Sequence, residues 1–459
     1  MVGTENGSAC LIDHYLIVCI FLSLFILTLV GVGDVLTVSM LGLLLCAAGF
    51  VQQSAQVDLW IFVPLVVYNL ASMASSYAIY GNITDGYASI QSVFPVLYLL
   101  RACLDRKEQF LTKQLAIIWV GIGAAAGIGQ FVFHAAAQGS AGRMGGLLGN
   151  PNAMGIFLAA GWFALMNCIG ELEEKGGFRF AFLSYIEPLL LAALAMTLSM
   201  GSFVAMASGI LVVLILKKRQ DSYQETFQYA CRILAKASLG MGTGMLMYLA
   251  AARTNMPWSC LLLLPYLLMA VICWKKFGLF LAEYPHMAAV ISALGVLVAA
   301  LAVAVRPSSI ATSAERLEMM RNGLHYLTQN PLLGVGPYQW RLLNLYDSDK
   351  YFNTWHIHNV LLHVGVEFGW IAMGMLALIV VRFYRKKAKI WEKGGFTAFC
   401  IHNLMDTSFF YMGITSLVLL TAGDPEMGGK KVGSIGLKTI FGSFALMFAY
   451  NLYRCIQAV

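Results

Sequence analysis

The sequence is poor in charge. Of its 459 residues, 12% are Asp, Glu, Lys or Arg, whereas 59% are hydrophobic. Soluble domains carry about 25% charged residues, and a run of about 18 or more apolar residues marks a transmembrane helix. Such runs recur along the whole chain. These proportions exclude an ordinary water-soluble globular protein and predict a polytopic membrane protein.

Cysteine-based frameworks are also missing. The 10 cysteines are scattered, mostly within apolar runs, and no CxxC or CxxH spacing occurs. We therefore expect neither a disulfide framework nor a zinc site, but small thiols packed between helices. The first apolar run lacks a preceding basic region and a following small-residue cleavage site, which favours a retained span over a signal peptide.

What the sequence does have is a series of apolar runs. They predict an all-α transmembrane helix bundle of about 12–14 spans, within a single polytopic membrane domain covering residues 1–459. The two short apolar runs that meet at Ser199-Met200-Gly201 are the least regular of the series. The runs fall at 11–31, 35–51, 58–80, 88–104, 114–134, 152–170, 181–199, 201–216, 229–251, 258–274, 284–305, 357–381, 396–420 and 434–453.

Basic residues are concentrated in alternate loops. Most of the 30 Lys and Arg residues lie in one set of loops, which includes 101–113, 217–219 and 382–393. By the positive-inside rule this set is cytoplasmic, so both termini are expected inside and the long loop 306–356 outside. The net charge of +7 follows from this anchoring, and a nucleic-acid partner is not expected.

The outward loop is expected to carry one short helix on the membrane surface. Ser313 is a suitable N-cap, and Asn330-Pro331 is a stop signal. The spacing of the apolar residues between them predicts one apolar stripe facing the membrane. The stripe consists of Leu317, Met320, Leu324 and Leu327.

Two arginines flank this stripe, Arg316 and Arg321. One interpretation is that they only solvate the exposed face of the helix or contact lipid phosphates. The functional interpretation is that they bind a phosphorylated substrate, because the planar guanidinium group matches phosphate oxygens and stays charged.

Three histidines lie in "NTWHIHNVLLHVGVEFGW", residues 353–370. If a helix begins near His356, then His358, Gly365 and Gly369 share one face, and the glycines form a groove below His358. Such a groove admits a neighbouring helix or an isoprenoid chain. Alternatively, the three histidines lie at the membrane interface and have no chemical role.

His363 and Glu367 share a different helix face, about 140° from His358. This separation makes a compact metal site of two histidines and one glutamate hard to build from this helix alone. We therefore expect no metal in the site.

Two further polar spots stand out. Arg143 and Asn152 lie at the start of a span, where Asn150-Pro151 is also typical of simple helix initiation. His402 and Asp406 are four residues apart within the predicted span 396–420. A buried ionisable pair in lipid indicates a function, although a His–Asp hydrogen bond that fixes helix packing explains it equally well.

Together these pieces resemble the bacterial O-antigen ligase and polysaccharide polymerase family, over residues of about 140 to 420. The most specific element is His358-Asn359, followed by nine residues and then Gly369. The segments that carry the resemblance are "GLLGNPNAMG", "SAERLEMMRNGLHYLTQNPLLGVGPYQW", "HNVLLHVGVEFGW" and "HNLMD".

The resemblance implies a C-type membrane glycosyltransferase of the bacterial cytoplasmic membrane, with its active site in an outward cavity and no metal or other cofactor. The implied donor is an oligosaccharide on undecaprenyl pyrophosphate, and the implied partners are membrane lipids and a glycan or lipid acceptor. His358 would take the acid–base role and Arg316 would clamp the pyrophosphate. The residues implied in substrate binding are Arg143, Arg321, Asn152, Asn359 and Gly369.

The chain departs from this family at one place. Many members have Ser-Arg-Gly where this sequence has Ser199-Met200-Gly201. A cationic contact is therefore missing, and Arg321 or Arg253 would have to supply it.

The sequence leaves ligase and polymerase open, with polymerase slightly favoured because no feature indicates a particular outer-membrane acceptor. The alternative from another class is a transporter or flippase for an amphiphilic solute or lipid-linked glycan. A transporter is expected to have polar groups and broken helices near the bilayer midplane, whereas the basic groups and histidines are expected here at the outer surface.

Overall fold

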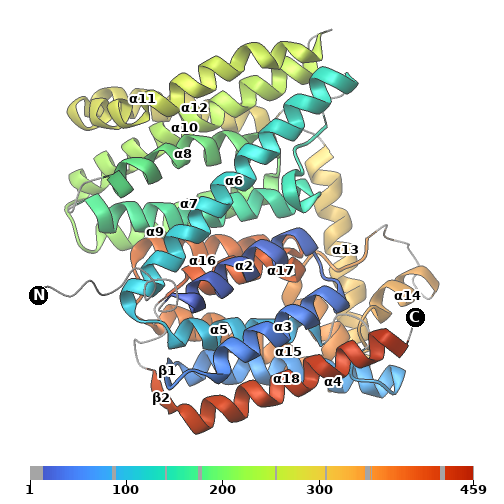
Figure 1. Ribbon diagram of the computed structural model, residues 1–459. Helices are drawn as coiled ribbons and strands as arrows, with labels where there is room; N and C mark the ends of the chain where they lie inside the picture. The colour runs from blue at the N-terminus through green and yellow to red at the C-terminus, as the bar shows by residue number, and fades with distance from the viewer. Residues whose placement is uncertain are drawn as a thin grey trace, which may run out of the picture. The chain divides into compact units, whose positions relative to one another are not determined.

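The computed structural model describes residues 14–84, 89–139, 142–173, 178–253, 256–304, 308–346, 352, 354–423 and 429–457. In these ranges every regular element is a helix except two strands of four residues, β1 (Ser54–Val57) and β2 (Lys430–Gly433). The two strands pair antiparallel, with Ser54 opposite Gly433. The predicted all-α fold is confirmed (Figure 1).

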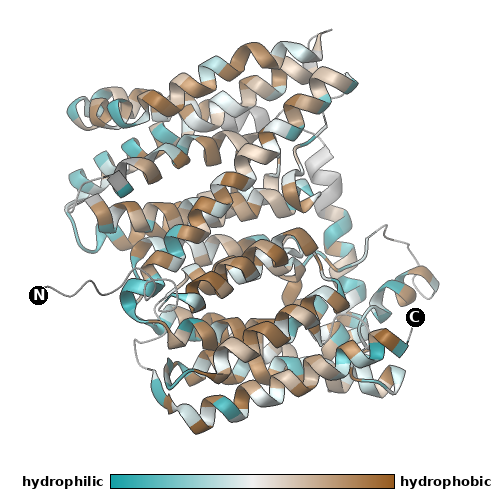
Figure 2. Cartoon of the chain, in the orientation of Figure 1, coloured by the Kyte–Doolittle hydropathy of each residue, from teal (hydrophilic) through white to brown (hydrophobic). Residues whose placement is uncertain are grey.

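Eight helices of the described ranges are long and apolar enough to cross a membrane, and six shorter helices are apolar. Figure 2 shows hydrophobic residues along most of these helices. The long helices are α4 (Leu59–Tyr80), α6 (Arg106–Gln138), α7 (Pro151–Glu173), α9 (Met200–Lys218), α10 (Tyr223–Arg253), α11 (Leu264–Glu283) with the preceding η3 (Pro257–Leu263), α15 (Val360–Arg385) and α18 (Ser434–Gln457). The shorter ones are α2 (Tyr15–Val30), α3 (Val35–Phe50), α5 (Val93–Cys103) with η1 (Ile90–Ser92), α8 (Phe178–Met196), α12 (Pro285–Ala304) and α17 (Met412–Thr421). The chain is a polytopic integral membrane protein.

Contacts within the chain divide it into two compact units. Unit 1 comprises Met1–Ala116, Glu318–Ala388 and Phe409–Val459, and unit 2 comprises Ile117–Leu317 and Lys389–Ser408. Helix α13 (Ser308–Gln329) contributes residues to both units, so Arg316 belongs to unit 2 and Arg321 to unit 1.

In unit 1, α15 packs along α4, α18 along α3, and α17 against α2 and α5. Helix α5 is buried over nearly its whole length. Its Arg101 donates hydrogen bonds to the carbonyl oxygens of Leu419, Ala422 and Gly423 at the end of α17. This buried cation satisfies carbonyl groups that have no partner within the helix, so it stabilises the C-terminal end of α17.

In unit 2, α16 (Ile390–Asn403) packs on α9 and α7, and α10 packs on α8 and α12. Glycines allow α9 and α16 to approach closely, because a Cβ atom on Gly209 would lie 2.5 Å from the carbonyl oxygen of Gly394. The buried carboxylate of Glu187 accepts hydrogen bonds from Lys236 Nζ at 2.5 Å and Trp274 Nε1 at 2.7 Å. This group joins α8, α10 and α11.

The predicted single span 396–420 is wrong. Helix α16 ends at Asn403, the 3₁₀ turn η4 (Ser408–Phe410) follows, and α17 begins only at Met412. Polar side chains replace the helical hydrogen bonds here: Asp406 Oδ1 accepts from the backbone N–H of Thr407, and the Ser408 hydroxyl donates to Asn403 Oδ1. His402 and Asp406 therefore do not share one helix.

The predicted helix in loop 306–356 exists, but it is longer. It is α13, which begins at Ser308, so Ser313 lies inside it, and it ends at Gln329 before Asn330-Pro331 as predicted. A second helix, α14 (Gln339–Tyr346), follows in the same loop.

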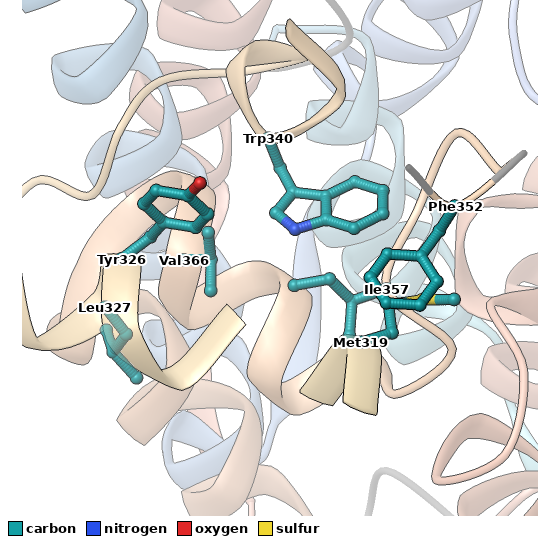
Figure 3. Close-up of a cluster of buried hydrophobic side chains, with 7 residues drawn as sticks. All are labelled: Met319, Tyr326, Leu327, Trp340, Phe352, Ile357 and Val366. Carbon is teal, nitrogen blue, oxygen red and sulfur yellow. The ribbon is translucent and has the colours of Figure 1, made fainter. Parts of the chain in front are cut away.

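The predicted apolar stripe of α13 is only partly correct. Leu317 and Leu324 are 53% and 51% exposed, as a stripe that faces the membrane requires, but Leu327 is buried and Met320 is partly buried inside unit 1. Sequence spacing alone does not show which of the many apolar residues face the core. The residues that do so form a cluster with α14 and α15 in unit 1 (Figure 3): Met319, Tyr326, Leu327, Trp340, Phe352, Ile357 and Val366.

Candidate functional site

The start of α7 is one end of a polar network in unit 2. The side-chain oxygen of Asn150 accepts hydrogen bonds from the backbone N–H groups of Asn152 and Ala153, at 2.8 and 3.3 Å. Pro151 occupies the first helical position, where its missing N–H costs nothing. The predicted helix start at Asn150-Pro151 is confirmed.

Arg143 lies in the loop before α7 and contacts two other segments of unit 2. Its Nε donates to the carbonyl oxygen of Thr197 at 2.9 Å, and its Nη2 donates to Asn152 Oδ1 at 2.7 Å. Asn152 in turn donates from Nδ2 to Asp406 Oδ2 at 2.8 Å. The network thus connects an exposed arginine, the start of α7 and the turn after α16.

Arg316 reaches the same turn. Its Nη1 donates a hydrogen bond of 2.7 Å to the carbonyl oxygen of Met405, the residue before Asp406. Arg316 is half-buried, which costs free energy unless the charged group keeps polar partners. The two predicted arginines Arg143 and Arg316 are therefore brought together through the turn that Met405 and Asp406 form.

The start of α9 lies next to the start of α7. Ser199 is the N-cap of α9, and its Oγ accepts from the backbone N–H of Ser202. The hydroxyl of Ser202 lies 3.4 Å from the carbonyl oxygen of Asn152, and a Cβ atom on Gly155 would lie 2.5 Å from that hydroxyl. Two helix N-termini, each with a partial positive charge, thus lie beside the arginine network.

His402 is fully buried near this network. Because the Ser408 hydroxyl donates to Asn403 Oδ1 at 3.1 Å, its oxygen accepts from His402 Nδ1 at 3.0 Å, which assigns the proton to Nδ1. A Cβ atom on Gly201 would lie 3.6 Å from the imidazole ring. The hydrogen bonds of His402 to Ser408 and of Asp406 to Asn152 replace the arrangement on one helix that we predicted from the sequence.

In unit 1, the histidine segment differs from the prediction. Helix α15 begins at Val360, and Asn359 is its N-cap, accepting from the backbone N–H of Leu362 at 3.0 Å. His358 therefore precedes the helix, and the predicted angle of about 140° between His358 and His363 does not apply. An asparagine before an apolar run is a good N-cap, so the sequence did contain this signal.

The predicted groove below His358 is also wrong. Helix α15 is broken at Gly369, which has a φ of 83°, and Gly365 is covered by neighbours. A Cβ atom on Gly365 would lie 3.0 Å from Met373 Sδ and 3.3 Å from Leu327 Cδ2. Side chains of α13 and α15 therefore fill the space below Gly365.

The break in α15 receives the loop between α13 and α14. The backbone N–H groups of Val335 and Gly336 donate to the carbonyl oxygens of Val366 and Glu367, at 2.8 and 3.0 Å. A Cβ atom on Gly369 would lie 2.0 Å from the carbonyl oxygen of Leu332. Gly369 is thus required by the backbone, because only glycine combines a positive φ with so close an approach.

His363 lies inside unit 1 beside the loop of residues 354–359, which contains His356 and His358. Its Nδ1 accepts from the backbone N–H of Ile357 at 3.4 Å, and its Nε2 lies 3.5 Å from Glu367 Oε2. The ring centroids of His363 and His356 are 4.8 Å apart, and Phe410 contacts both rings. His358 is half-buried at the end of this loop.

The remaining predicted cations are placed differently. Arg321 is exposed on α13 in unit 1, and the side chain of Arg253 lies outside the described residues. Arg143 contacts the segment just before Met200, because it donates to the carbonyl oxygen of Thr197. Among the residues that the structure describes, no three His, Cys, Asp or Glu side chains gather as metal ligands.

The fold and this network define a polytopic membrane protein with a cationic polar site at the start of two of its helices. Residues 188–377 match a family model described as O-antigen ligase. This match assigns the segment to the O-antigen ligase family and confirms the resemblance found in the sequence. Comparison with curated proteins gives no match. Family and fold together support a membrane enzyme of surface polysaccharide synthesis that ligates or polymerises glycans and acts on lipid-linked oligosaccharides.

The matched segment covers only part of the network. It includes Arg316, the start of α9 and the residues from His358 to Gly369, but Arg143, Asn152 and Asp406 lie outside it. Sequence reasoning missed that the turn with Met405 and Asp406 holds the arginines. The available signal was the group of polar residues Asn403, Asp406, Thr407 and Ser408 inside an otherwise apolar stretch.

Proposed function

We propose that the protein transfers or polymerises an oligosaccharide from an undecaprenyl-pyrophosphate carrier, at the outer face of the bacterial cytoplasmic membrane. The observation that carries this proposal is the network of unit 2, in which Arg143 and Arg316 lie beside two helix N-termini. The match to the O-antigen ligase family supports the class of reaction.

The charges of this network suit a pyrophosphate. Its two guanidinium groups and two helix N-termini outweigh the single carboxylate of Asp406. Negative charge develops on the pyrophosphate as its bond to the sugar carbon breaks, and cations held beforehand stabilise that charge most effectively. The hydrogen bonds from Arg143 to Thr197 and from Arg316 to Met405 hold both groups in place.

The roles of the other predicted residues remain part of the proposal. His358 accepts the proton of the attacking acceptor hydroxyl, while the glycosidic bond forms and the carrier pyrophosphate leaves. Arg321 and Asn359 contact the substrate, and Gly369 shapes the backbone of α15 around the break. The reaction proposed for these residues uses no metal ion.

The proposed orientation follows the distribution of Lys and Arg in the sequence. Loop 306–356, which contains α13 and α14, lies outside the cytoplasmic membrane, and both termini lie in the cytoplasm. This orientation gives Arg316 of α13 access to a glycan carrier whose sugars face outward.

A transporter or flippase is the second candidate, and one observation favours it. The structure contains broken helices, at Gly369 in α15 and between α16 and α17, and broken helices are typical of transporter binding sites. A flippase moves the lipid-linked glycan without changing it, whereas a transferase lengthens a glycan and releases the carrier.

Reconstitution separates the two functions. Purified protein in vesicles is supplied with an undecaprenyl-pyrophosphate oligosaccharide, and products are analysed by mass spectrometry while the sidedness of the lipid is followed in parallel. Longer glycans together with free carrier pyrophosphate support the transferase. Movement of the intact lipid across the bilayer without a new product supports the flippase.

A further inference from the structure

His363 is a fully buried polar side chain whose two ring nitrogens both face polar groups. It is 0% exposed, so each nitrogen needs a partner inside the protein. Nδ1 accepts the backbone N–H of Ile357, which assigns the ring proton to Nε2, and Nε2 faces the carboxyl group of Glu367. These two contacts select one neutral tautomer and one orientation of the ring.

The group that His363 holds is the backbone directly before His358. The N–H of Ile357 belongs to the peptide between His356 and Ile357, and the Ile357 side chain is fully buried in the cluster of Figure 3. On the other side of His358, Asn359 caps α15. His358 is thus held between two fixed backbone points, and His363 determines one of them.

The other partner of His363 is fixed independently. The carbonyl oxygen of Glu367 accepts the hydroxyl of Ser75 at 2.7 Å and the N–H of Gly336 at 3.0 Å. It can receive these donors because α15 is broken two residues later, at Gly369. Helix α4 and the loop before α14 therefore locate Glu367, Glu367 orients His363, and His363 locates the backbone before His358.

We propose that His363 is a positioning residue for His358, and that Glu367 acts by holding the tautomer and orientation of His363. The chemical role of His358 in this inference rests on the proposed function. The inference also gives a reason for the spacing between His358 and Gly369, because the break at Gly369 anchors the residue that orients His363.

Three variants test this arrangement. His363→Phe keeps the ring contacts with His356 and Phe410 but removes the acceptor for Ile357. His363→Asn places an amide oxygen near the position of Nδ1, so that it preserves the acceptor. Glu367→Gln removes the carboxyl group while keeping the side-chain shape. His325→Phe, at an exposed histidine of α13, is the matched control.

Two measurements are made on each full-length variant in detergent or vesicles. Hydrogen exchange of peptides covering 354–362 reports the protection of the Ile357 amide independently of any activity. Steady-state glycan transfer gives kcat and KM. A displaced His358 is expected to lower kcat about 10- to 100-fold with little change in KM, because misplacement by about 1 Å costs this much.

The positioning role predicts that His363→Phe loses both the amide protection and kcat, that His363→Asn keeps both within a few-fold, and that Glu367→Gln lies between them. The control should match the wild type in both measurements. Unchanged protection and kcat in His363→Phe would overturn the inference, as would an equal loss in His363→Asn while the variant remains folded. Absence of transfer by the wild type would instead refute the proposed function, and hydrogen exchange would still decide whether His363 holds the loop.

Discussion

The guanidinium group of Arg316 donates a hydrogen bond of 2.7 Å to the carbonyl oxygen of Met405, although the two residues are 89 positions apart in the chain. This bond holds Arg316 against the turn that also anchors Arg143 through Asn152 and Asp406. An arginine held in this way keeps further N–H donors for a second acceptor, since the guanidinium has five.

Replacing Arg316 with lysine should therefore lower glycan transfer strongly. A lysine ammonium is a point charge that cannot bond Met405 and present a planar fork to a phosphate at the same time. Loss of one such donor costs roughly 100-fold in kcat. The measurement is transfer by Arg316→Lys, compared with the wild type at matched membrane expression. Full activity of Arg316→Lys would remove Arg316 from the site.

Arg143 and Asp406 should act as one unit. Asn152 connects them by hydrogen bonds of 2.7 and 2.8 Å, so removing either residue disrupts the same network. A double-mutant cycle with Arg143→Ala and Asp406→Ala should give a coupling free energy of about 0.5–3 kcal/mol in the activation barrier. Additive effects of the two substitutions would show that Arg143 and Asp406 affect the reaction independently of each other.

Arginine at position 200 should partly restore activity to Arg143→Ala. Met200 is the first residue of α9, and Arg143 contacts the carbonyl oxygen of Thr197 just before that helix. The resemblance to the family leads to the expectation of an arginine where Met200 stands. The test compares Arg143→Ala with the double variant Arg143→Ala, Met200→Arg. A matched control places arginine one turn farther along α9, at the exposed Val204. Equal activities of the two double variants would contradict this prediction.

Gly369→Ala should destabilise unit 1. Alanine at a φ of 83° costs about 1–3 kcal/mol, and its Cβ atom would also lie 2.0 Å from the carbonyl oxygen of Leu332. Gly374→Ala in the same helix is the control, because nothing lies within 4 Å of its added Cβ atom. Thermal unfolding in detergent should show a lower Tm for Gly369→Ala and an equal or higher Tm for Gly374→Ala. Equal unfolding temperatures in all three proteins would mean that the break in α15 at Gly369 does not contribute to the stability of unit 1.

Loop 306–356 should be labelled from outside the cell. Tyr346 is 81% exposed at the end of α14, so Tyr346→Cys in a background without the native cysteines should react with an impermeant thiol reagent in spheroplasts. Lys387→Cys, in the exposed connection between α15 and α16, should react only after permeabilisation. The reverse pattern would invert the orientation and exclude a reaction at the outer face.

The spans could be predicted because a membrane helix must be apolar over its whole length, and that property is local in the sequence. The interruption at 404–411 was missed for the same reason. Phe409 and Phe410 keep this stretch apolar on average, while Asn403, Asp406 and Ser408 bond the backbone and each other. Local hydropathy does not reveal that polar side chains compete with the helix for the hydrogen bonds of the backbone.

The candidate site was predicted in its residue types more than in its arrangement. The sequence indicated Arg316 and Arg321 as phosphate-binding arginines, and the resemblance added Arg143. The connection of Arg316 and Arg143 through the turn at Met405 and Asp406 depends on segments far apart in the chain. The predicted groove is absent because His358 precedes the N-cap Asn359 and therefore lies on no face of α15. The orientation of His363 depends on the break at Gly369, which helical periodicity cannot anticipate.

The most direct measurement is the release of undecaprenyl pyrophosphate by the reconstituted protein. Wild type is compared with the double variant Arg143→Ala, Arg316→Ala in vesicles that contain the lipid-linked oligosaccharide and an acceptor glycan, with a chelator present. The proposed function predicts that the wild type releases one carrier for each glycan transferred and that the double variant releases almost none. Intact donor after incubation with the wild type, or equal release by both proteins, would contradict it.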